Sequence, residues 1–344
     1  EAIATGTLQL LFPGNYSNIL SPNKHYFQLN RDYSNFSEAL DLISNDKKRI
    51  EITKVAYEEV ILNKDNWIET FVENFDKKIL QLVGKKRKKN DGSFIINSNN
   101  QNILLMAAHP LKIDPRIEWI KDYSPSSIKV HTFGIHYDGQ EKLISSSKNS
   151  QYEISIMRQR WNDSYILKLL DYVGDDKLGL AAVSELIKMN TLLACTEKSF
   201  CEILGAPYGH ERNTTFRWYL QYFLDQSITL ILASTHMKGV DMIISTDLDT
   251  LAASLIVKSI YKIPVFYDAH EYYPDSDVLR ISYERQFFAN LEKKLVPYTD
   301  LRQTVSPGLA EIMEEDYNVE FSYVPNCEPL RKLKLSKKTS DKDR

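Results

Sequence analysis

The residues best suited to chemistry stand directly after short apolar segments that we expect to be buried strands. His270 follows the segment Val265–Tyr267, and Asp268 and Glu271 lie beside it. A histidine in this position can donate a hydrogen bond to an oxygen of a bound sugar or phosphate, because its imidazole gains a proton near neutral pH. The alternative is a histidine that is only hydrogen-bonded within a loop. His270 is therefore the sharpest catalytic candidate.

Other polar residues follow the remaining apolar segments in the same way. His109, Asp114 and Arg116 follow the segment Ile103–Ala107, and His136 follows Ile128–Ile135. Asp247 and Asp249 follow Met242–Ser245, and Ser306 follows Leu301–Val305. Taken alone, Asp249 or Ser306 is explained by the capping of a helix N-terminus. Ligands of open α/β sheets bind beyond the carboxyl ends of the strands, so the agreement of several segments predicts one polar cleft.

The segments that must position these residues alternate regularly between strand and helix after residue 240. Helices are predicted at 250–261, 283–296 and 307–317, between short strands at 242–245, 265–267, 301–305 and 321–324. Asp114 and Pro115 begin an earlier helix as N-cap and first-turn proline, and residues 151–236 are expected to be mostly helical. This alternation predicts an α/β fold with a Rossmann-like, doubly wound parallel sheet over residues 103–330.

The chain before residue 103 has a different pattern. A capping box of Asn35 and Glu38 predicts a helix over Phe36–Leu62. A second helix is predicted over Trp67–Leu82, whose apolar stripe is typical of core packing. Residues 83–102 are polar, contain five consecutive basic residues and predict a solvated linker. Contact of this basic run with phosphate or an anionic membrane is the alternative.

Composition limits the classes of function. The 344 residues include 43 Lys and Arg against 46 Asp and Glu, a formal net charge of −3, so no nucleic-acid partner is expected. Three scattered cysteines predict no disulfide framework and favour a reducing, cytoplasmic location. No apolar run is long enough to cross a membrane. No glycine-rich phosphate loop, nucleophile elbow or metal-ligand spacing is present, so we expect neither a cofactor nor a metal.

Residues 103–326 resemble the amino-terminal half of a GT-B glycosyltransferase of the family 4 type. The matching segments are His109-Pro110 with Asp114–Arg116, Val240–Ile243 running into Asp247–Leu251, Val265–Glu271, Asp300–Ser306 and Val324–Asn326. The resemblance implies sugar transfer from a nucleotide-sugar donor to a glycan or lipid-linked acceptor in polysaccharide or glycoconjugate biosynthesis. It also implies retention of the anomeric configuration and no obligatory metal.

In that family this half of the molecule binds the acceptor, and the missing half binds the nucleotide-sugar. The histidine that matches His270 lies near the transferred sugar. The resemblance therefore makes His270 the catalytic candidate. It also offers a set of substrate-binding candidates, which are His109, Asp114, Arg116, Asp247, Asp249, Glu271 and Ser306.

Residues 1–82 resemble the end of the donor domain of a different GT-B glycosyltransferase. The segment Glu1–Leu8 is similar to the end of a motif with two glutamates, and Glu1 would be the second one, which holds the nucleotide ribose. His25-Tyr26, Asp32–Asn35 and Tyr57 also fit the ending of that family. Together the two resemblances imply a fragment of a tandem enzyme with a polar tail over 331–344. We expect this fragment alone to be inactive.

Other functions are left open by the residues. One is a nucleotide-sugar epimerase of the same fold, and another is a hydrolase that uses His270 and Glu271 as acid and base. A third is a non-catalytic glycan-binding scaffold, with the stretch 151–236 as its binding surface. A downstream pair of donor-site glutamates would favour the transferase, and its absence the scaffold. Peripheral association with the inner face of the membrane is also left open.

Overall fold

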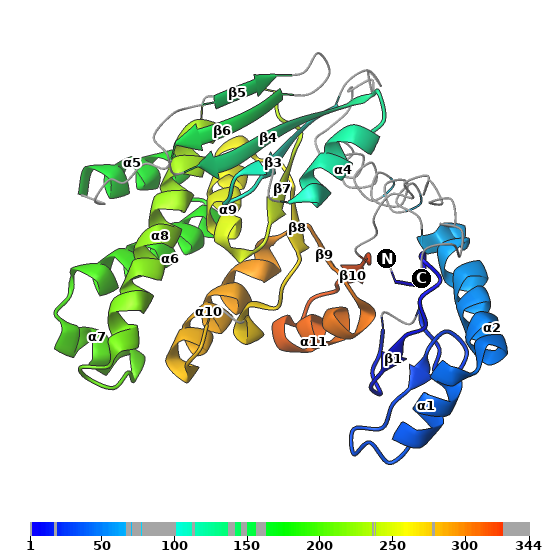
Figure 1. The fold of residues 1–344 in the computed structure, drawn as a ribbon. Coiled ribbons are helices and arrows are strands. Elements are labelled where there is room, and N and C mark those ends of the chain that lie inside the picture. Colours follow the sequence, from blue (N-terminus) through cyan, green and yellow to red (C-terminus); the bar gives the residue numbers. More distant parts are fainter. Residues whose placement is uncertain are drawn as a thin grey trace. The chain divides into compact units, whose positions relative to one another are not determined.

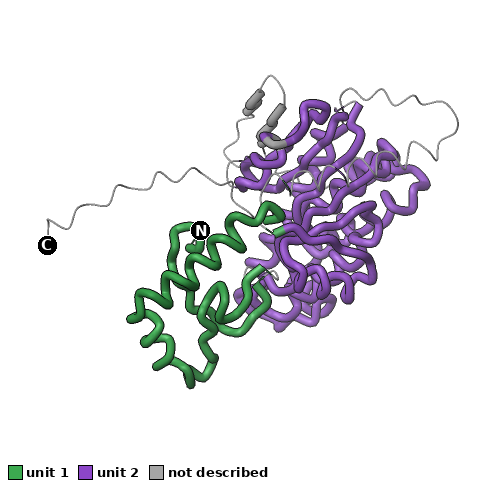
Figure 2. The backbone as a smooth tube through the Cα atoms, turned by 90° about the vertical axis from the view of Figure 1, so that its right-hand side faces the viewer, with its two compact units in different colours: residues 1–75, 325–344 green, residues 76–324 purple. Residues whose placement is uncertain are grey.

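The chain divides into two compact units in the computed structural model. Unit 1 comprises residues 1–75 and 325–344, and unit 2 comprises residues 76–324 (Figure 2). The structure describes residues 2–16, 19–66, 70, 77, 101–111, 114–136, 142–145, 150–155, 163–235, 237, 239–276 and 279–325. The helix expected over 67–82 lies outside the described residues except for its positions 70 and 77. Residues 83–100 of the predicted linker and the tail 331–344 also lie outside them.

Unit 2 is built on one eight-stranded sheet in its described part, with the order β10-β9-β8-β7-β3-β4-β6-β5 (Figure 1). The strands are β3 (Gln101–Met106), β4 (Ile128–His136), β5 (Lys142–Ser145), β6 (Ser150–Ser155), β7 (Met242–Thr246), β8 (Val265–Ala269), β9 (Leu301–Thr304) and β10 (Ser322–Tyr323). Neighbouring strands are parallel except β5, which pairs antiparallel with β6. The sequence prediction of an α/β fold with a parallel sheet is confirmed.

The order of the parallel strands is that of a Rossmann-like sheet. Counted along the chain without β5, the strands lie in the order 3-2-1-4-5-6 with one further strand beyond the sixth. The chain therefore reverses its direction of progress between β3 and β7, which are adjacent in the sheet. Because crossover connections are right-handed, helices on the two sides of this reversal lie on opposite faces of the sheet.

The helices flank this sheet. They are α4 (Pro115–Tyr123), α5 (Asp163–Val173), α6 (Lys177–Ala194), α7 (Glu197–Leu204), α8 (Glu211–Ser234), α9 (Leu248–Tyr261), α10 (Ser282–Leu295) and α11 (Pro307–Tyr317), with short 3₁₀ turns η4 (Tyr273–Asp275) and η5 (Val296–Tyr298). The expected mostly helical stretch 151–236 is corrected at its start, where β6 reaches Ser155 and pairs with β5. The predicted linker also ends earlier than expected, because β3 already begins at Gln101.

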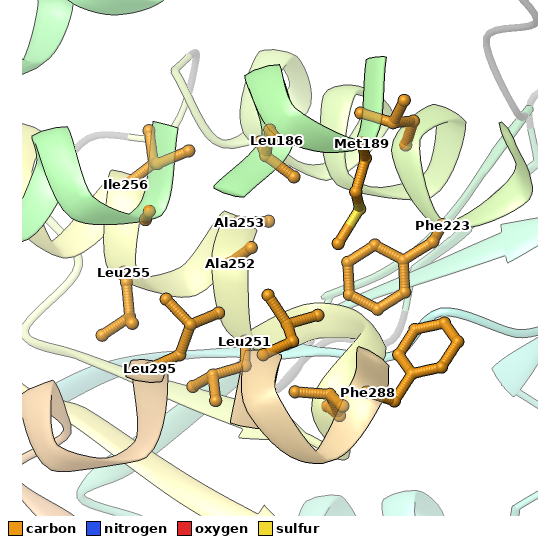
Figure 3. Packing of buried hydrophobic residues seen from close by; sticks show 14 of the residues in the cluster. Leu186, Met189, Phe223, Leu251, Ala252, Ala253, Leu255, Ile256, Phe288 and Leu295 are labelled. Atoms are coloured by element: carbon orange, nitrogen blue, oxygen red, sulfur yellow. The ribbon is translucent and has the colours of Figure 1, made fainter. Parts of the chain in front are cut away.

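The core of unit 2 is centred on α9, which is buried on nearly all sides. Leu251 and Ala252 of α9 pack among Met189 of α6, Phe223 of α8 and Phe288 of α10 (Figure 3). A helix that is apolar all round has to lie inside a domain. Helices α6 and α9 approach each other closely at Gly179 of α6, where a Cβ would clash with the Ser259 hydroxyl of α9. This packed layer fixes the start of α9, where the site residues lie.

Unit 1 contains two short parallel strands and two helices in its described part. They are β1 (Leu10–Leu11), β2 (Phe27–Gln28), α1 (Phe36–Ser44) and α2 (Asp46–Ala56), followed by the π-helical turn η1 (Tyr57–Ile61) and the 3₁₀ turn η2 (Lys64–Asn66). The single helix expected over Phe36–Leu62 is wrong, because Asn45 ends α1 and caps α2 by accepting from the Lys48 N–H at 3.1 Å.

The expected capping box of unit 1 is also absent. The Asn35 side chain accepts from the Asn30 N–H and donates to the Gln28 carbonyl, both at 2.8 Å. It therefore fastens the end of β2 to the start of α1 and does not cap that helix. In the described residues of both units, no helix is both long and apolar enough to cross a membrane.

Candidate functional site

The polar side chains converge at the carboxyl edge of the sheet, where the strand order reverses. β3 lies between β4 and β7 there, and the chain leaves β3 and β7 toward opposite faces. This reversal point is where open α/β sheets hold their ligands. Residues that follow β3, β7 and β8 meet at this point with Asp268 near the end of β8. We call them the His270 cluster, which consists of Asp114, Arg116, Asp247, Asp268 and His270.

The imidazole of His270 lies among three carboxyl groups from three different segments. Its Nε2 is 3.0 Å from Asp268 Oδ2, and its Nδ1 is 3.4 Å from Asp247 Oδ2 and 3.7 Å from Asp114 Oδ2. The side chain of His270 is only 5% exposed. Sequence analysis placed this residue directly after the predicted strand 265–267, and the structure shows in addition that its side chain is buried. The ring is a buried part of a charge network at the edge of the sheet.

Nδ1 of His270 lies within ion-pair distance of Asp247 and Asp114, at 3.4 and 3.7 Å, but its hydrogen-bond geometry to them is poor. Among the described residues, no hydrogen bond of good geometry is made by Nδ1 of His270. A buried polar atom without a partner is rare in folded proteins and calls for an explanation. In a site for a ligand, the explanation is that a ligand oxygen accepts this hydrogen bond.

Asp247 holds this arrangement through a strained backbone. Its φ is 59° and its ψ is 172°, a region that is essentially restricted to glycine. The Asp247 N–H donates to the Asp268 carbonyl at 3.0 Å, and Asp247 Oδ1 accepts from the His270 N–H at 2.7 Å. Such strain costs about 1–3 kcal/mol and persists where the surroundings fix it, typically at functional sites.

Asp114 and Arg116 form the side of the cluster that follows β3. Asp114 caps α4 by accepting from the Arg116 N–H, and it accepts from Arg116 Nε and Nη2 at 2.8 Å each. Burial raises the pKa of Asp114, but the hydrogen bonds and charge of Arg116 outweigh burial and lower it overall. Asp114 therefore stays ionised beside His270.

The histidine is held in its charged form. Burial alone lowers the pKa of His270, but the charges of Asp268 and Asp247 outweigh this and raise it to about 10. Burial likewise raises the pKa of Asp247, and the His270 charge turns the net shift downward. His270 is therefore an imidazolium at neutral pH, so it acts as a hydrogen-bond donor and not as a general base.

Asp249 is the member of the site that can carry a proton near neutral pH. Burial, followed by the charge of Asp247, raises the pKa of the Asp249 carboxyl to about 8. Asp249 lies in the first turn of α9, and its charge is one of those that raise the pKa of Tyr273. A carboxyl with a pKa close to the working pH suits general acid–base work, a role the sequence did not assign to it.

The remaining predicted site residues take other positions. His109 Nε2 is 4.0 Å from Asp114 Oδ2, at the rim of the cluster. The loop that carries His109 packs closely against β4 at Gly134, where a Cβ would lie 2.6 Å from Leu111 Cγ and would clash with it. Ser306 caps α11, accepting from the Leu309 N–H at 3.3 Å. Glu271 is exposed and accepts from the Ser276 hydroxyl. Glu1 lies outside the described residues.

Sequence reasoning did not count Asp268 among the site residues. The predicted strand 265–267 ended too early, so Asp268 was taken as a loop neighbour of His270, whereas β8 extends to Ala269. The signal that could have identified Asp268 is the alternation of side chains between the two faces of a strand. Tyr267 points into the core, so Asp268 must point to the other face, where the site lies.

The balance of charge in the site limits its ligands. The two cationic groups of Arg116 and His270 face three carboxyl groups within the cluster, and Glu271 lies beyond it. An anionic phosphate is poorly matched to such a site, whereas neutral hydroxyl groups can both donate to carboxylates and accept from the imidazolium. No His, Cys, Asp and Glu side chains in the described part of the chain are grouped to hold a metal ion.

No family model matches the sequence, and the comparison with curated proteins finds no match. The function has to be inferred from the site and from the sequence motifs that surround it.

Proposed function

We propose that unit 2 is the acceptor half of a GT-B glycosyltransferase of the family 4 type. It would act in the cytoplasm, in polysaccharide or glycoconjugate biosynthesis. The reaction is transfer of a sugar from a nucleotide-sugar to a glycan or lipid-linked acceptor. The observation that carries the proposal is the buried, charged His270 with its unmet Nδ1 at the point where the strand order reverses. The sequence resemblance gives this same position to the histidine near the transferred sugar.

The residues of the cluster have distinct roles in this reaction. The His270 imidazolium donates from Nδ1 to a hydroxyl oxygen of the transferred sugar. Asp247 orients His270 by two contacts: Oδ1 of Asp247 accepts a hydrogen bond from the His270 backbone N–H, and Oδ2 of Asp247 lies 3.4 Å from Nδ1 of the ring. Asp249, with its pKa raised to about 8 by burial and by Asp247, can exchange a proton with a hydroxyl group. Arg116 keeps Asp114 ionised, and Asp114 in turn stabilises the charge of His270.

The excess of carboxyl groups in the site supports the proposal that the acceptor and the donor phosphates are bound by different halves of the enzyme. Nucleotide phosphates are held by helix N-termini and basic side chains. The N-cap of α9 is instead Asp247. Burial raises the pKa of Asp247 but the His270 charge lowers it overall, so Asp247 stays ionised and repels an anion. The cluster therefore fits hydroxyl groups of the acceptor and of the transferred sugar, and donor phosphates belong to the other half of a GT-B enzyme.

For unit 1 we propose the end of the donor domain of a second glycosyltransferase in a tandem enzyme. The turn after Glu1 supports this, because Gly6 has a φ of 72° and the Thr7 N–H donates to the Ala2 carbonyl at 3.0 Å. This is how a helix typically ends at a left-handed glycine. Glu1 would then hold the ribose of that domain's nucleotide-sugar.

The test is product analysis with the natural full-length protein and a panel of nucleotide-sugars and oligosaccharide acceptors. The proposal predicts a glycosylated acceptor with the anomeric configuration of the donor, and no turnover by the 344-residue chain alone. An epimerised nucleotide-sugar would contradict the proposal and identify an epimerase. Cleavage of a glycan without a donor would identify a hydrolase, and binding without turnover of any donor would identify a scaffold.

A further inference from the structure

Helix α8 carries two aromatic side chains that are exposed although half of the helix is core. Trp218 is 70% exposed and Tyr222 is 37% exposed. From Phe223 to Ile231 every residue of the same helix is buried. Before Tyr222 only one face of the helix is in the core, through Phe216 and Leu220, and Trp218 and Tyr222 are exposed outside that face. Large exposed aromatics side by side on one helix face are a common sign of a binding surface.

This aromatic face is continuous with the edge of the sheet where the His270 cluster lies. Further along α8, Gln226 Nε2 donates to the Ala108 carbonyl at 2.7 Å, and Ala108 lies in the loop that leads from β3 to Asp114. At about 100° and 1.5 Å per residue, Tyr222 and Trp218 lie roughly 40° and 80° around the helix from Gln226, and about 6 and 12 Å along it. The exposed face therefore begins at Tyr222, about one helical turn from the buried Gln226 that contacts the loop of the candidate site, and extends away from it.

The chemistry of the face suits a neutral saccharide. Its other exposed residues are Thr214, Thr215 and Glu211, which offer two hydroxyl groups and one carboxylate. Aromatic rings cover the apolar C–H face of a sugar ring, and hydroxyl and carboxylate oxygens bond its hydroxyl groups. Glu211, Thr214, Thr215, Trp218 and Tyr222, the described residues of this face, include no cation that could pair with an anionic ligand.

An anionic membrane is disfavoured as the occupant, because the nearby basic side chains are already engaged. Arg212 of α8 forms a two-point ion pair with Glu284, at 2.7 and 3.0 Å. Arg217 donates to the carbonyls of Leu193 and Cys195, and its guanidinium lies 4.3 Å from the centre of the Phe200 ring. Attraction to anionic lipid needs several basic side chains facing the surface.

We propose that Trp218 and Tyr222 form a subsite for a neutral oligosaccharide, which extends the candidate site along α8. Its role as an acceptor subsite rests on the proposed glycosyl transfer, but the binding itself does not. A saccharide held there reaches toward the loop after β3, so its next sugar unit approaches Asp114 and His270. The subsite would select acceptors by their length and by their lack of charge.

The test is calorimetric binding to the chain of short neutral oligomers of glucose, galactose and N-acetylglucosamine. Trp218→Ala is expected to raise the Kd of the bound oligomer at least about tenfold, as loss of a large aromatic contact does. Tyr298→Ala is the matched control, because Tyr298 is an aromatic of η5 that is 40% exposed just before β9, at the amino edge of the sheet. The control should leave the Kd unchanged, and melting curves should show both variants folded.

Each other outcome has a defined meaning. The subsite is refuted if no oligomer binds, or if Trp218→Ala and Tyr298→Ala weaken binding equally. Loss of binding to phosphatidylglycerol vesicles in Trp218→Ala, without any saccharide binding, would replace the subsite with a membrane contact. In the full-length enzyme, Trp218→Ala should raise the KM for the acceptor and leave kcat and the KM for the donor unchanged. Binding that depends on Trp218 in a protein without transfer activity would refute the transferase and keep the subsite.

Discussion

Two buried clusters of titratable groups lie on either side of strand β8. The His270 cluster contains Asp268, and the second cluster contains its neighbour Tyr267, with Glu292 of α10 and Tyr317 of α11. In this Glu292 cluster, both carboxylate oxygens of Glu292 accept a hydrogen bond of 2.7 Å, one from each tyrosine hydroxyl. Burial is the main cause that raises the pKa of Glu292 to about 7. Adjacent residues of one strand therefore serve two different charge networks.

The comparison shows that burial and a shifted pKa do not by themselves identify a functional site. Both clusters have them, but they differ in position and in completeness. The Glu292 cluster lies within the core, and each of its carboxylate oxygens has a partner. The His270 cluster lies at the carboxyl edge of the sheet, contains the strained Asp247, and leaves Nδ1 of His270 without a good hydrogen bond. We therefore assign function to the His270 cluster and structure to the Glu292 cluster.

The largest effect on stability is expected from His270→Ala. It removes one of the two cations of the cluster, the imidazolium that lies among three carboxyl groups, and breaking a buried ion pair in this way costs roughly 3–5 kcal/mol. Because the folded state raises the pKa of His270 from 6.5 to about 10, the stabilising contribution is complete below pH 6.5 and is lost as the pH rises toward 10.

Chemical denaturation of the wild type and His270→Ala between pH 5 and 10 checks this prediction. The difference in unfolding free energy should be largest near pH 5–6 and shrink steadily above that range. A difference within about 0.5 kcal/mol, the usual size for exposed positions, would mean that His270 is a surface residue after all.

The next largest effect is expected from Glu292→Leu. The leucine has a similar volume but leaves the hydroxyls of Tyr267 and Tyr317 buried without an acceptor, at a cost of about 1–3 kcal/mol for each. Equilibrium unfolding at pH 6 measures this loss. Glu292→Gln, which keeps an acceptor oxygen, serves as the control and should lose less. Equal stability of Glu292→Leu and the wild type would show that the tyrosines do not depend on this carboxyl.

A smaller effect is expected in the pH dependence of Glu292→Gln. Since burial raises the pKa of Glu292 from 4.5 to about 7, the folded state holds this proton more tightly than the unfolded state does. The wild type should therefore lose stability as the pH rises from 4.5 to 7, by about 1.4 kcal/mol for each unit of pKa shift. Glu292→Gln should lack this part of the slope. Parallel pH profiles for the two proteins would contradict the raised pKa.

The smallest effect on stability is expected from Asp247→Asn, on the order of 1 kcal/mol. The asparagine keeps an acceptor for the His270 N–H but removes a charge that lies 3.4 Å from Nδ1. The pKa of His270, followed by the nitrogen chemical shifts of its ring, should fall below about 10. An unchanged titration would mean that Asp268 and Asp114 alone hold the proton.

How much the sequence could predict differs between the elements and the site. The apolar alternation after residue 240 predicted the strands and helices there, because each strand is short, buried and separated by a complete helix. The ends of the strands decide which residues enter the site, and those ends depend on pairing with neighbours. β8 reaches Ala269 because Asp268 and Ala269 pair with Gln303 and Thr304 of β9, whereas the apolar run in the sequence is interrupted at Asp268. The positive φ of Asp247 was equally invisible in the sequence.

Turnover of the natural full-length protein tests the central claim most directly, with His270→Ala and Glu292→Leu compared side by side. Both variants are expected to be destabilised, so kcat per folded molecule is measured at a temperature below both melting transitions. His270→Ala should reduce kcat by about 10²-fold or more, because the proposed hydrogen bond to the sugar would strengthen in the transition state. Glu292→Leu should stay within about twofold of the wild type, since it acts only on folding. Similar losses in the two variants, or full activity of His270→Ala, would contradict the assignment of function to the His270 cluster.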